Sequence, residues 1–244
     1  MDNLVEQEQK EEYLIFPDKE DRHQIVEIGR KIDEYVHDRG IQDIIFVDRS
    51  ARPGYITVLE NWRRMYPTET PPNIFFMSPK GFRSLEEIEN GSRVHIKDNV
   101  NASNKDDLPE SRMNIRSRSE VKADLLKTYP ILFGNIGRHV LLFDTCIHSG
   151  DSIKPILEFL TELGLDVRVG IVSSEKIYTN IYVDLKINDG TLSGGCNPFD
   201  KDRLVQKSYE SVHGLKNEKA SQILKSNQIR QEIRHAVSDY YEQR

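Results

Sequence analysis

The sequence contains little cysteine and no long apolar run. Its two cysteines, Cys146 and Cys196, lack the spacing of a metal-binding pair and favour a reducing compartment over a disulfide framework. No apolar stretch approaches the roughly 20 residues that cross a bilayer, so we expect no membrane partner. The first residues, MDNLVEQEQKEEY, are acidic and have no apolar core of a signal peptide. We therefore expect a soluble, cytoplasmic protein.

An excess of positive charge is also missing, as are the motifs of several enzyme classes. The net charge of −6 argues against broad nucleic-acid binding. There is no glycine fingerprint for a dinucleotide, no P-loop ending in Gly-Lys-Ser/Thr and no G-x-S-x-G elbow. These absences argue against the dinucleotide enzymes, the P-loop nucleotidases and the serine hydrolases of that type.

What is present suits one α/β domain with additions at its ends. The 244 residues are 37% hydrophobic and 30% charged, a composition typical of a folded protein. We divide them into a polar tail (1–20), an α/β domain (21–215) and a C-terminal amphipathic helix (216–244). The tail holds YLIF before Pro17, which is either a short strand or a docking segment. We expect the C-terminal helix to pack on its own domain, with a homodimer contact as the alternative.

Apolar runs and helical spacing alternate along the domain. Runs typical of strands occur at 43–48, 73–78, 139–144 and 166–174, and helical spacing occurs at 21–39, 55–65, 120–132 and 153–163. The run at 180–189 alternates enough to be one more strand, for which we consider antiparallel pairing. The pattern predicts an α/β fold with a central, mostly parallel sheet flanked by helices, and extra N- and C-terminal helices.

A long segment between two of the predicted strands, at about 79–118, has almost no large apolar side chains. A segment of this kind inside a domain is typical of a mobile functional loop, an inserted lid or a disordered stretch. Its far end is basic, with Arg112, Arg116, Arg118 and Lys122. These residues either begin a solvated helix or belong to a cationic lid.

The stretch HVLLFDTCIHSGDSIKPILEFLTELG carries the strongest functional signal. An apolar strand ends at Asp144, and a polar loop leads directly to a helix N-terminus, where backbone N–H groups suit an anion. Ser149 and Ser152 add hydroxyl groups, and Gly150 allows a close approach of the backbone. Pro155 falls in the first helical turn, where its missing N–H is tolerated. The arrangement favours a phosphate-binding loop.

Other interpretations of this loop remain open at this point. Ser152 as an ordinary N-cap and Gly150 as a turn residue would explain the same letters. CIHSGDS also resembles a cysteine phosphatase loop, but Ser152 stands where that loop has an arginine to lower the thiol pKa. A haloacid-dehalogenase-like aspartyl nucleophile at Asp144 would need a second acid where Cys146 stands.

The stretch VLLFDTCIHSGDS resembles the signature of the type I phosphoribosyltransferases. That signature is an apolar strand, two acidic residues, three variable residues and Thr/Ser-Gly-x-Thr/Ser at the start of a helix. The match lies in the apolar lead Val140–Phe143, in Asp144 and in 149–152, whereas Thr145 replaces the second acid. The resemblance covers about 43–174 and implies a type I phosphoribosyltransferase-like fold.

The resemblance also implies roles for individual residues. Asp144 would bind the ribose hydroxyls of 5-phosphoribosyl 1-diphosphate and Mg²⁺, and Thr145 could donate a hydrogen bond to the ribose. The residues expected to hold the 5-phosphate are His148, Ser149, Gly150, Asp151 and Ser152. After the first strand, FVDRSARPGY corresponds to the diphosphate loop, where Arg49 and Arg52 would bind the leaving group beside Asp48, Ser50 and Ala51.

The function implied is transfer of a phosphoribosyl group to or from a base-like acceptor, with Mg²⁺ as cofactor and diphosphate as product. The missing acid at Thr145 supports an alternative of another class, a catalytically inactive protein that senses a nucleotide or sugar phosphate on the same fold. In both cases the expected ligand is phosphoribosyl diphosphate or a nucleotide.

Overall fold

The protein was analysed as a computed structural model that describes residues 13–47, 51–82, 117–134, 137–146, 153–173, 181–187 and 220–243. The strands in these ranges are β1 (Asp43–Val47), β2 (Asn73–Met77), β3 (His139–Cys146), β4 (Asp166–Ser173) and β5 (Leu185–Lys186). The helices are α1 (Lys19–Asp38), α2 (Gly54–Met65), α4 (Arg118–Thr128), α5 (Pro130–Phe133), α6 (Lys154–Glu162) and α7 (Ala220–Glu242), with the 3-10 turn η1 (Pro79–Phe82).

The five strands form one sheet in the order β2-β1-β3-β4-β5, and every pairing in it is parallel. β1 pairs with β2 from Asp43–Asn73 to Val47–Met77, and with β3 from Asp43–Val140 to Phe46–Phe143. The carboxyl ends of β1 and β3 therefore lie side by side.

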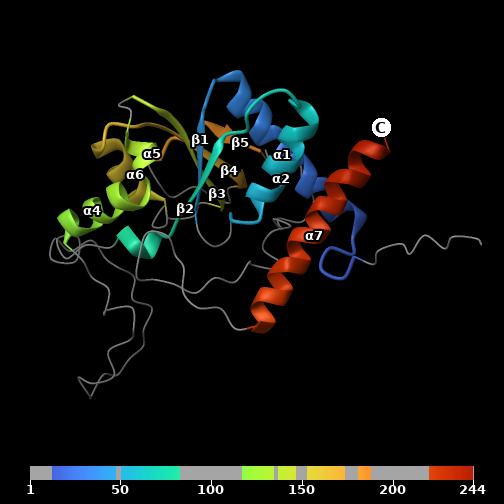
Figure 1. Cartoon of the computed structure of the whole chain (residues 1–244). Helices are drawn as coiled ribbons and strands as arrows, with labels where there is room; N and C mark the ends of the chain where they lie inside the picture. The colour runs from blue at the N-terminus through green and yellow to red at the C-terminus, as the bar shows by residue number, and fades with distance from the viewer. Residues whose placement is uncertain are drawn as a thin grey trace, which may run out of the picture.

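The chain winds in opposite directions from these two central strands. From β1 it passes through α2 to β2, and from β3 it passes through α6 to β4. Because such crossovers are right-handed, a reversal of direction moves the connecting helix to the other face of the sheet. In agreement, α1, α2 and α7 cover one face, and α4, α5 and α6 cover the other (Figure 1).

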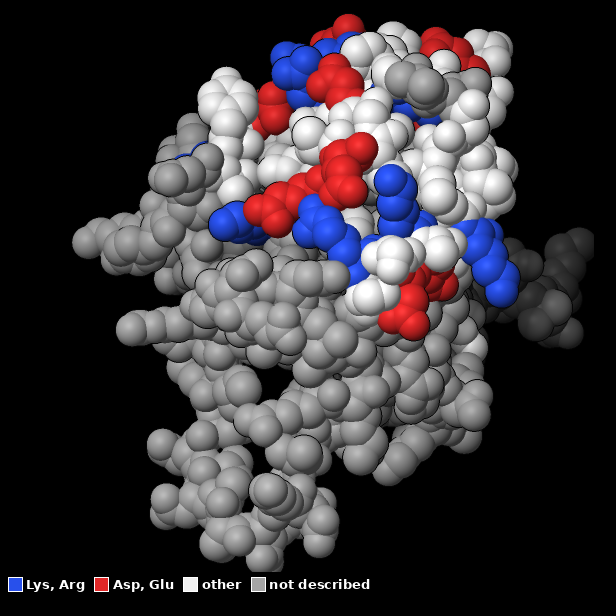
Figure 2. All heavy atoms as spheres, turned by 90° about the vertical axis from the view of Figure 1, so that its left-hand side faces the viewer, with Lys and Arg blue, Asp and Glu red and all other residues white. Residues whose placement is uncertain are grey.

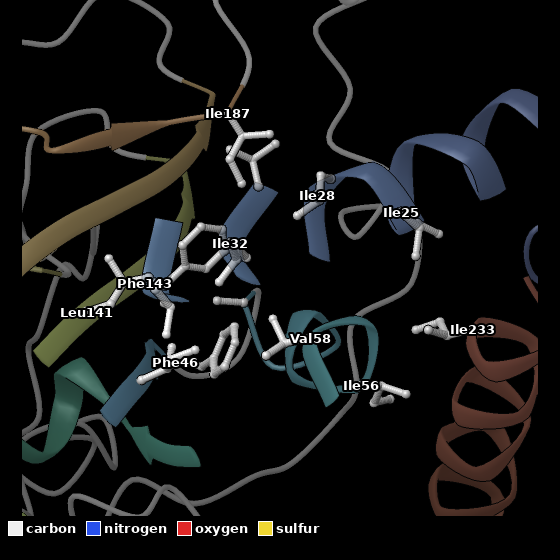
Figure 3. Packing of buried hydrophobic residues seen from close by; sticks show 14 of the residues in the cluster. Ile25, Ile28, Ile32, Phe46, Ile56, Val58, Leu141, Phe143, Ile187 and Ile233 are labelled. Carbon is white, nitrogen blue, oxygen red and sulfur yellow. The ribbon is translucent and has the colours of Figure 1, made fainter. Parts of the chain in front are cut away.

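Alternate residues of the central strands supply two separate cores. Ile44 and Phe46 of β1, with Leu141 and Phe143 of β3, face α1, α2 and α7 (Figure 3). The alternate residues of the same two strands face α4, α5 and α6; these are Ile45, Val47, Val140 and Leu142. Each fully buried side chain of this size stabilises the fold by about 1.5–3 kcal/mol, so both faces of the sheet are committed to helices.

Most of the predicted architecture is confirmed. The sheet is parallel and flanked by helices, with α1 and α7 as the additional terminal helices, and α1 ends before Gly40, which has a φ of 60°. α7 packs on α1 and α2 of its own chain. The division into domains and a homodimer contact stay predictions.

Two predictions about elements are wrong. The helix expected over 120–132 is two helices, because α4 ends at Thr128 and Pro130 begins α5 in a new direction. The strand expected within 180–189 with antiparallel pairing is β5, which pairs in parallel with β4, Gly170 opposite Leu185. Alternation alone does not determine strand direction, since parallel and antiparallel strands share the same two-residue period.

Charged side chains are paired at the amino edge of the sheet. Asp43 has no exposed surface; Arg138 Nε lies 2.5 Å from its Oδ2, and Asn73 Nδ2 donates to its Oδ1 at 2.8 Å. Burial raises the pKa of the Asp43 carboxyl, and Asn73 and Arg138 oppose that rise. The group joins β1, β2 and the residue before β3 at the edge away from the predicted site.

The segment before α1 is bound to α7 through Glu232. This carboxylate is 5% exposed and accepts the backbone N–H groups of Leu14, Ile15 and Phe16 at 2.9–3.1 Å. The Phe16 side chain is buried in the core. Of the two interpretations of YLIF, the docking segment is therefore correct, and residues 13–16 form no strand.

Asp33 of α1 is a buried carboxyl group in the interface with α2. It has no exposed surface, and neither of its oxygens has a hydrogen-bond partner within the described part of the chain. Burial, with a smaller contribution from Glu34, raises the pKa of Asp33 well above its usual range. Nearby, a Cβ on Gly29 would lie 2.6 Å from the Thr57 Cβ, so the two helices pack too closely for water to solvate a charge.

Replacement of Glu232 tests the attachment of the N-terminal segment. Glu232→Ala leaves the N–H groups of Ile15 and Phe16 without their acceptor and should lower the free energy of unfolding by about 2–3 kcal/mol. Urea unfolding followed by the fluorescence of Trp62, the single tryptophan, measures this loss. The control is Asp239→Asn, which weakens only the exposed bond from the Tyr13 hydroxyl. Equal effects of the two variants would contradict the role of Glu232.

Replacement of Asp33 should change how stability depends on pH. Unfolded Asp33 loses its proton near pH 4, at a pKa of about 3.9, whereas folded Asp33 retains it to higher pH. The unfolded state therefore binds fewer protons above pH 4, and this group makes the protein less stable as pH rises toward the folded pKa. Asp33→Asn, which does not titrate, should be more stable than wild type at pH 7 and differ least near pH 4.

Urea unfolding at the two pH values measures this difference. Asp38→Asn, on the same helix with its carboxyl exposed, is the control. The prediction would be refuted if the free energy of unfolding of Asp33→Asn differed from that of wild type by the same amount at both pH values.

Candidate functional site

The candidate site lies at the carboxyl edge of the sheet, at the junction of β1 and β3. Chains that leave two adjacent parallel strands in opposite directions open a crevice beyond those strand ends, and ligands of open α/β sheets bind there. With the order β2-β1-β3-β4-β5, this position falls between β1 and β3. Asp144 at the end of β3, and Ala51 and Arg52 after β1, belong to the two segments singled out in the sequence; residues 48–50 and 148–152 of these segments lie outside the described residues.

Asp144 and Thr145 lie at the end of β3 and point to opposite faces of the sheet. Asp144 pairs with Ile171 of the core formed with α6, and strand alternation turns Thr145 toward α1 and α2, as it does Phe143. Asp144 is 4% exposed and Thr145 2% exposed. Asp144 Oδ1 accepts the Thr145 backbone N–H at 2.7 Å, which fixes the carboxylate at the strand end.

Ala51 and Arg52 follow β1 and begin the turn into α2. The Ala51 N–H donates to the Val47 carbonyl at 3.3 Å, and the Ala51 side chain is buried in the first core. The Arg52 guanidinium carbon lies 4.0 Å from the centre of the Phe76 ring of β2, and Arg52 is 6% exposed. Arg52 and Asp144 thus reach the same edge of the sheet from opposite faces, with Arg52 over β2 and Asp144 on β3.

The other predicted site residues lie outside the described residues. They are Asp48, Arg49 and Ser50 after β1, and His148, Ser149, Gly150, Asp151 and Ser152 after β3. The same holds for Cys196 and for most of the predicted mobile loop. α6 begins at Lys154 with Ile153 at its N-cap position and Pro155 in the first turn. Ser152 itself lies outside the described residues, so its interpretation as an ordinary N-cap stays a prediction.

The basic residues at the far end of the predicted loop belong in part to α4. Arg118 starts this helix, pairs with Glu162 of α6 at 2.6 Å and lies over the Phe159 ring at 4.5 Å. On the face of the molecule formed by α4 and α6, basic and acidic side chains are interspersed in the described part (Figure 2). Of the two interpretations of these basic residues, the start of a helix is correct for Arg118, because it is the first residue of α4 and its guanidinium pairs with α6.

Sequence reasoning missed Phe76, which contacts a predicted site residue. The sequence places Phe76 in a strand, and no functional role was inferred for it. Alternation in β2 nevertheless directs Phe75 and Phe76 to different faces of the sheet. Phe75 packs edge-on against Tyr129, and Phe76 faces Arg52 and the Tyr55 ring. The signal available was the pair of adjacent aromatic residues near the end of a strand beside the predicted diphosphate loop.

The donor set at this edge fits a magnesium ion carried by a phosphorylated ligand. Among the described residues there is no group of three or more histidine, cysteine, aspartate or glutamate side chains that would enclose a metal. Asp144 offers a carboxylate, and Mg²⁺ typically binds one or two carboxylates with phosphate oxygens and water. None of the described helices combines the length and the apolar character needed to cross a bilayer.

No family model and no curated protein matches this sequence. Similar solved structures include two of hypoxanthine phosphoribosyltransferase, a glutamine mutant and an asparagine mutant of an invariant aspartic acid. Each is 10% identical to this chain with a TM-score of 0.37, covering 69% of this chain and 76% or 74% of its own length. A likeness this weak carries no argument, so function is inferred from the topology and the site residues.

Substitutions at Thr145 test whether the burial of this side chain explains why an uncharged residue stands at this position. Thr145→Asp puts a carboxylate on the core side of β3 and should lower the free energy of unfolding by at least about 3 kcal/mol. Thr145→Val keeps the shape and should cost less than about 1.5 kcal/mol. Urea unfolding of both variants measures the difference. An aspartate variant as stable as the valine variant would show that this side chain is not confined to the core.

Proposed function

We propose that the protein binds 5-phosphoribosyl 1-diphosphate, or a nucleotide, at the junction of β1 and β3. It would transfer the phosphoribosyl group to or from a base-like acceptor, with release or uptake of diphosphate. The observation that supports this proposal is the reversal of winding between β1 and β3, with Asp144 and Arg52 at the same edge of the sheet.

The span between Arg52 and Asp144 supports a ligand with an anionic group at one end and ribose hydroxyl groups at the other. β2, which carries the contact with Arg52, and β3, which carries Asp144, are two strand spacings apart, about 10 Å. A ribose with a 5-phosphate and a 1-diphosphate is long enough to bridge them. The ribose would lie at Asp144, with its 5-phosphate toward 148–152 and its diphosphate toward Arg52 and Arg49.

Positioning and charge stabilisation would supply most of the catalysis. In the proposed reaction, the bond from the anomeric carbon to diphosphate breaks, a bond to an acceptor nitrogen forms, and the acceptor loses a proton. Positive charge develops on the ribose and negative charge on the diphosphate, so Asp144 would stabilise the former and the arginines the latter. When bound, Mg²⁺ neutralises diphosphate charge, and Asp144 is the residue that would hold it.

The alternative proposal is a sensor without turnover. Thr145 stands where the signature has its second acid, and the side chain is 2% exposed on the core side of β3. A site with one carboxylate in place of two can hold a sugar phosphate through hydrogen bonds while it stabilises the developing positive charge less.

Replacement of Asp144 tests the proposal directly. Wild type should bind 5-phosphoribosyl 1-diphosphate saturably in calorimetry, only with Mg²⁺, and the ligand should raise the melting temperature. Asp144→Asn should weaken binding at least about tenfold, because it removes a charged acceptor. The control is Asp166→Asn, the same change at the amino end of the neighbouring strand β4.

Each outcome separates the alternatives. Unchanged affinity in Asp144→Asn, or no binding by wild type, would refute the proposed site. Diphosphate release on addition of purine or pyrimidine bases identifies a transferase, and tight binding without release identifies a sensor.

A further inference from the structure

The contact between Arg52 and Phe76 has no counterpart in the signature that suggested the site. Phe76 is half-buried near the end of β2, opposite Phe46 of β1, and the Arg52 guanidinium carbon lies 4.0 Å from its ring centre. The Tyr55 ring packs edge-on against the Phe76 ring, with the centroids 5.2 Å apart and the planes at 82°. Phe76 is thus in contact with both Arg52 and Tyr55.

An aromatic ring packed against a guanidinium group stabilises the cation and also fixes its orientation. The negative face of the ring attracts the cation, most strongly where water is excluded, and Arg52 is 6% exposed. The five N–H donors of arginine lie in the guanidinium plane, so a ring that occupies one face fixes the plane in which they donate. Paired hydrogen bonds to phosphate oxygens require that plane to be set in advance.

Other interactions hold the strand that carries Phe76. The Tyr129 hydroxyl of the α4–α5 junction donates to the Phe76 carbonyl. β2 is also paired with β1 along its full length. The ring under Arg52 is therefore attached to a fixed backbone, which a positioning element requires.

We infer that Phe76 is a positioning residue for Arg52, and that its ring holds the Arg52 guanidinium in place to bind a diphosphate group at the carboxyl edge of β1 and β2. The inference rests on the proposed function and adds a residue and a ligand group to it. Phe76 itself makes no contact with the ligand; it acts by setting the guanidinium plane.

Calorimetry with two probes, inorganic diphosphate and ribose 5-phosphate, each with Mg²⁺, tests this role. Phe76→Leu keeps an apolar side chain without the ring face and should weaken diphosphate binding about tenfold, with ribose 5-phosphate unaffected. Phe76→Tyr retains the ring and should keep wild-type affinity for both. Phe75→Leu is the matched control, the same change on the next residue and the opposite face, and should affect neither probe.

A double-mutant cycle with Arg52→Met shows whether Phe76 acts through Arg52. In that background Phe76→Leu should cause no further loss of diphosphate affinity. A loss of similar size in both backgrounds, or equal effects of Phe76→Leu and Phe75→Leu on both probes, would overturn the inference. If Phe76→Leu does not show the wild-type unfolding transition of Trp62, Phe76→Met replaces it.

The two probes also distinguish this inference from the proposed function. Wild type that binds ribose 5-phosphate but not diphosphate refutes the role of Arg52 and Phe76 and leaves the sugar-phosphate site standing. Wild type that binds neither probe refutes both.

Discussion

β1 and β3 pair in parallel from Asp43–Val140 to Phe46–Phe143, and the chain leaves them in opposite directions. Parallel strands require long connections, and the right hand of those connections decides which face each helix covers. Because the direction reverses at this pair, α2 and α6 lie on opposite faces and both faces of the central strands are buried.

The two edges of the sheet differ in how their polar groups are satisfied. At the amino edge, Asp43 binds both Asn73 and Arg138, and Asp166 binds His139 and Arg168. These contacts stabilise the strand starts. At the carboxyl edge, Asp144 accepts a backbone N–H from the next residue, and Arg52 lies on an aromatic ring. Both side chains are held in place by local contacts, as the binding of a ligand requires.

Strand positions could be predicted closely from the sequence because both faces of this sheet are buried. Buried parallel strands are short apolar runs with polar ends, and the run over 43–48 differs from β1 by one residue. The helix over 120–132 was predicted less well, since its apolar spacing continues through a proline that turns the chain at Tyr129. Similarly, nothing in the run at 180–189 distinguishes a parallel from an antiparallel neighbour.

The candidate site could be predicted in position but not in orientation. Asp144 at a strand end and a loop after β1 follow from local patterns, and the topology makes them neighbours. Alternation alone puts Asp144 and Thr145 on opposite faces of the sheet, but the pairing with β4 was needed to show which face each side chain takes. The contact of Arg52 with Phe76 joins residues from two strand ends, and only the three-dimensional structure brings them together.

The attachment of residues 14–16 to Glu232 has a consequence for the order of folding. These partners are 216 to 218 residues apart in the chain, so closing the loop between them is entropically costly and slow. During synthesis the segment that contains Phe16 emerges long before α7 and stays without its acceptor until the last helix is made. The sheet and α1 can pack earlier through contacts of shorter range. The contact between residues 14–16 and Glu232 therefore forms late, and its presence shows that the chain has folded from residue 14 through α7.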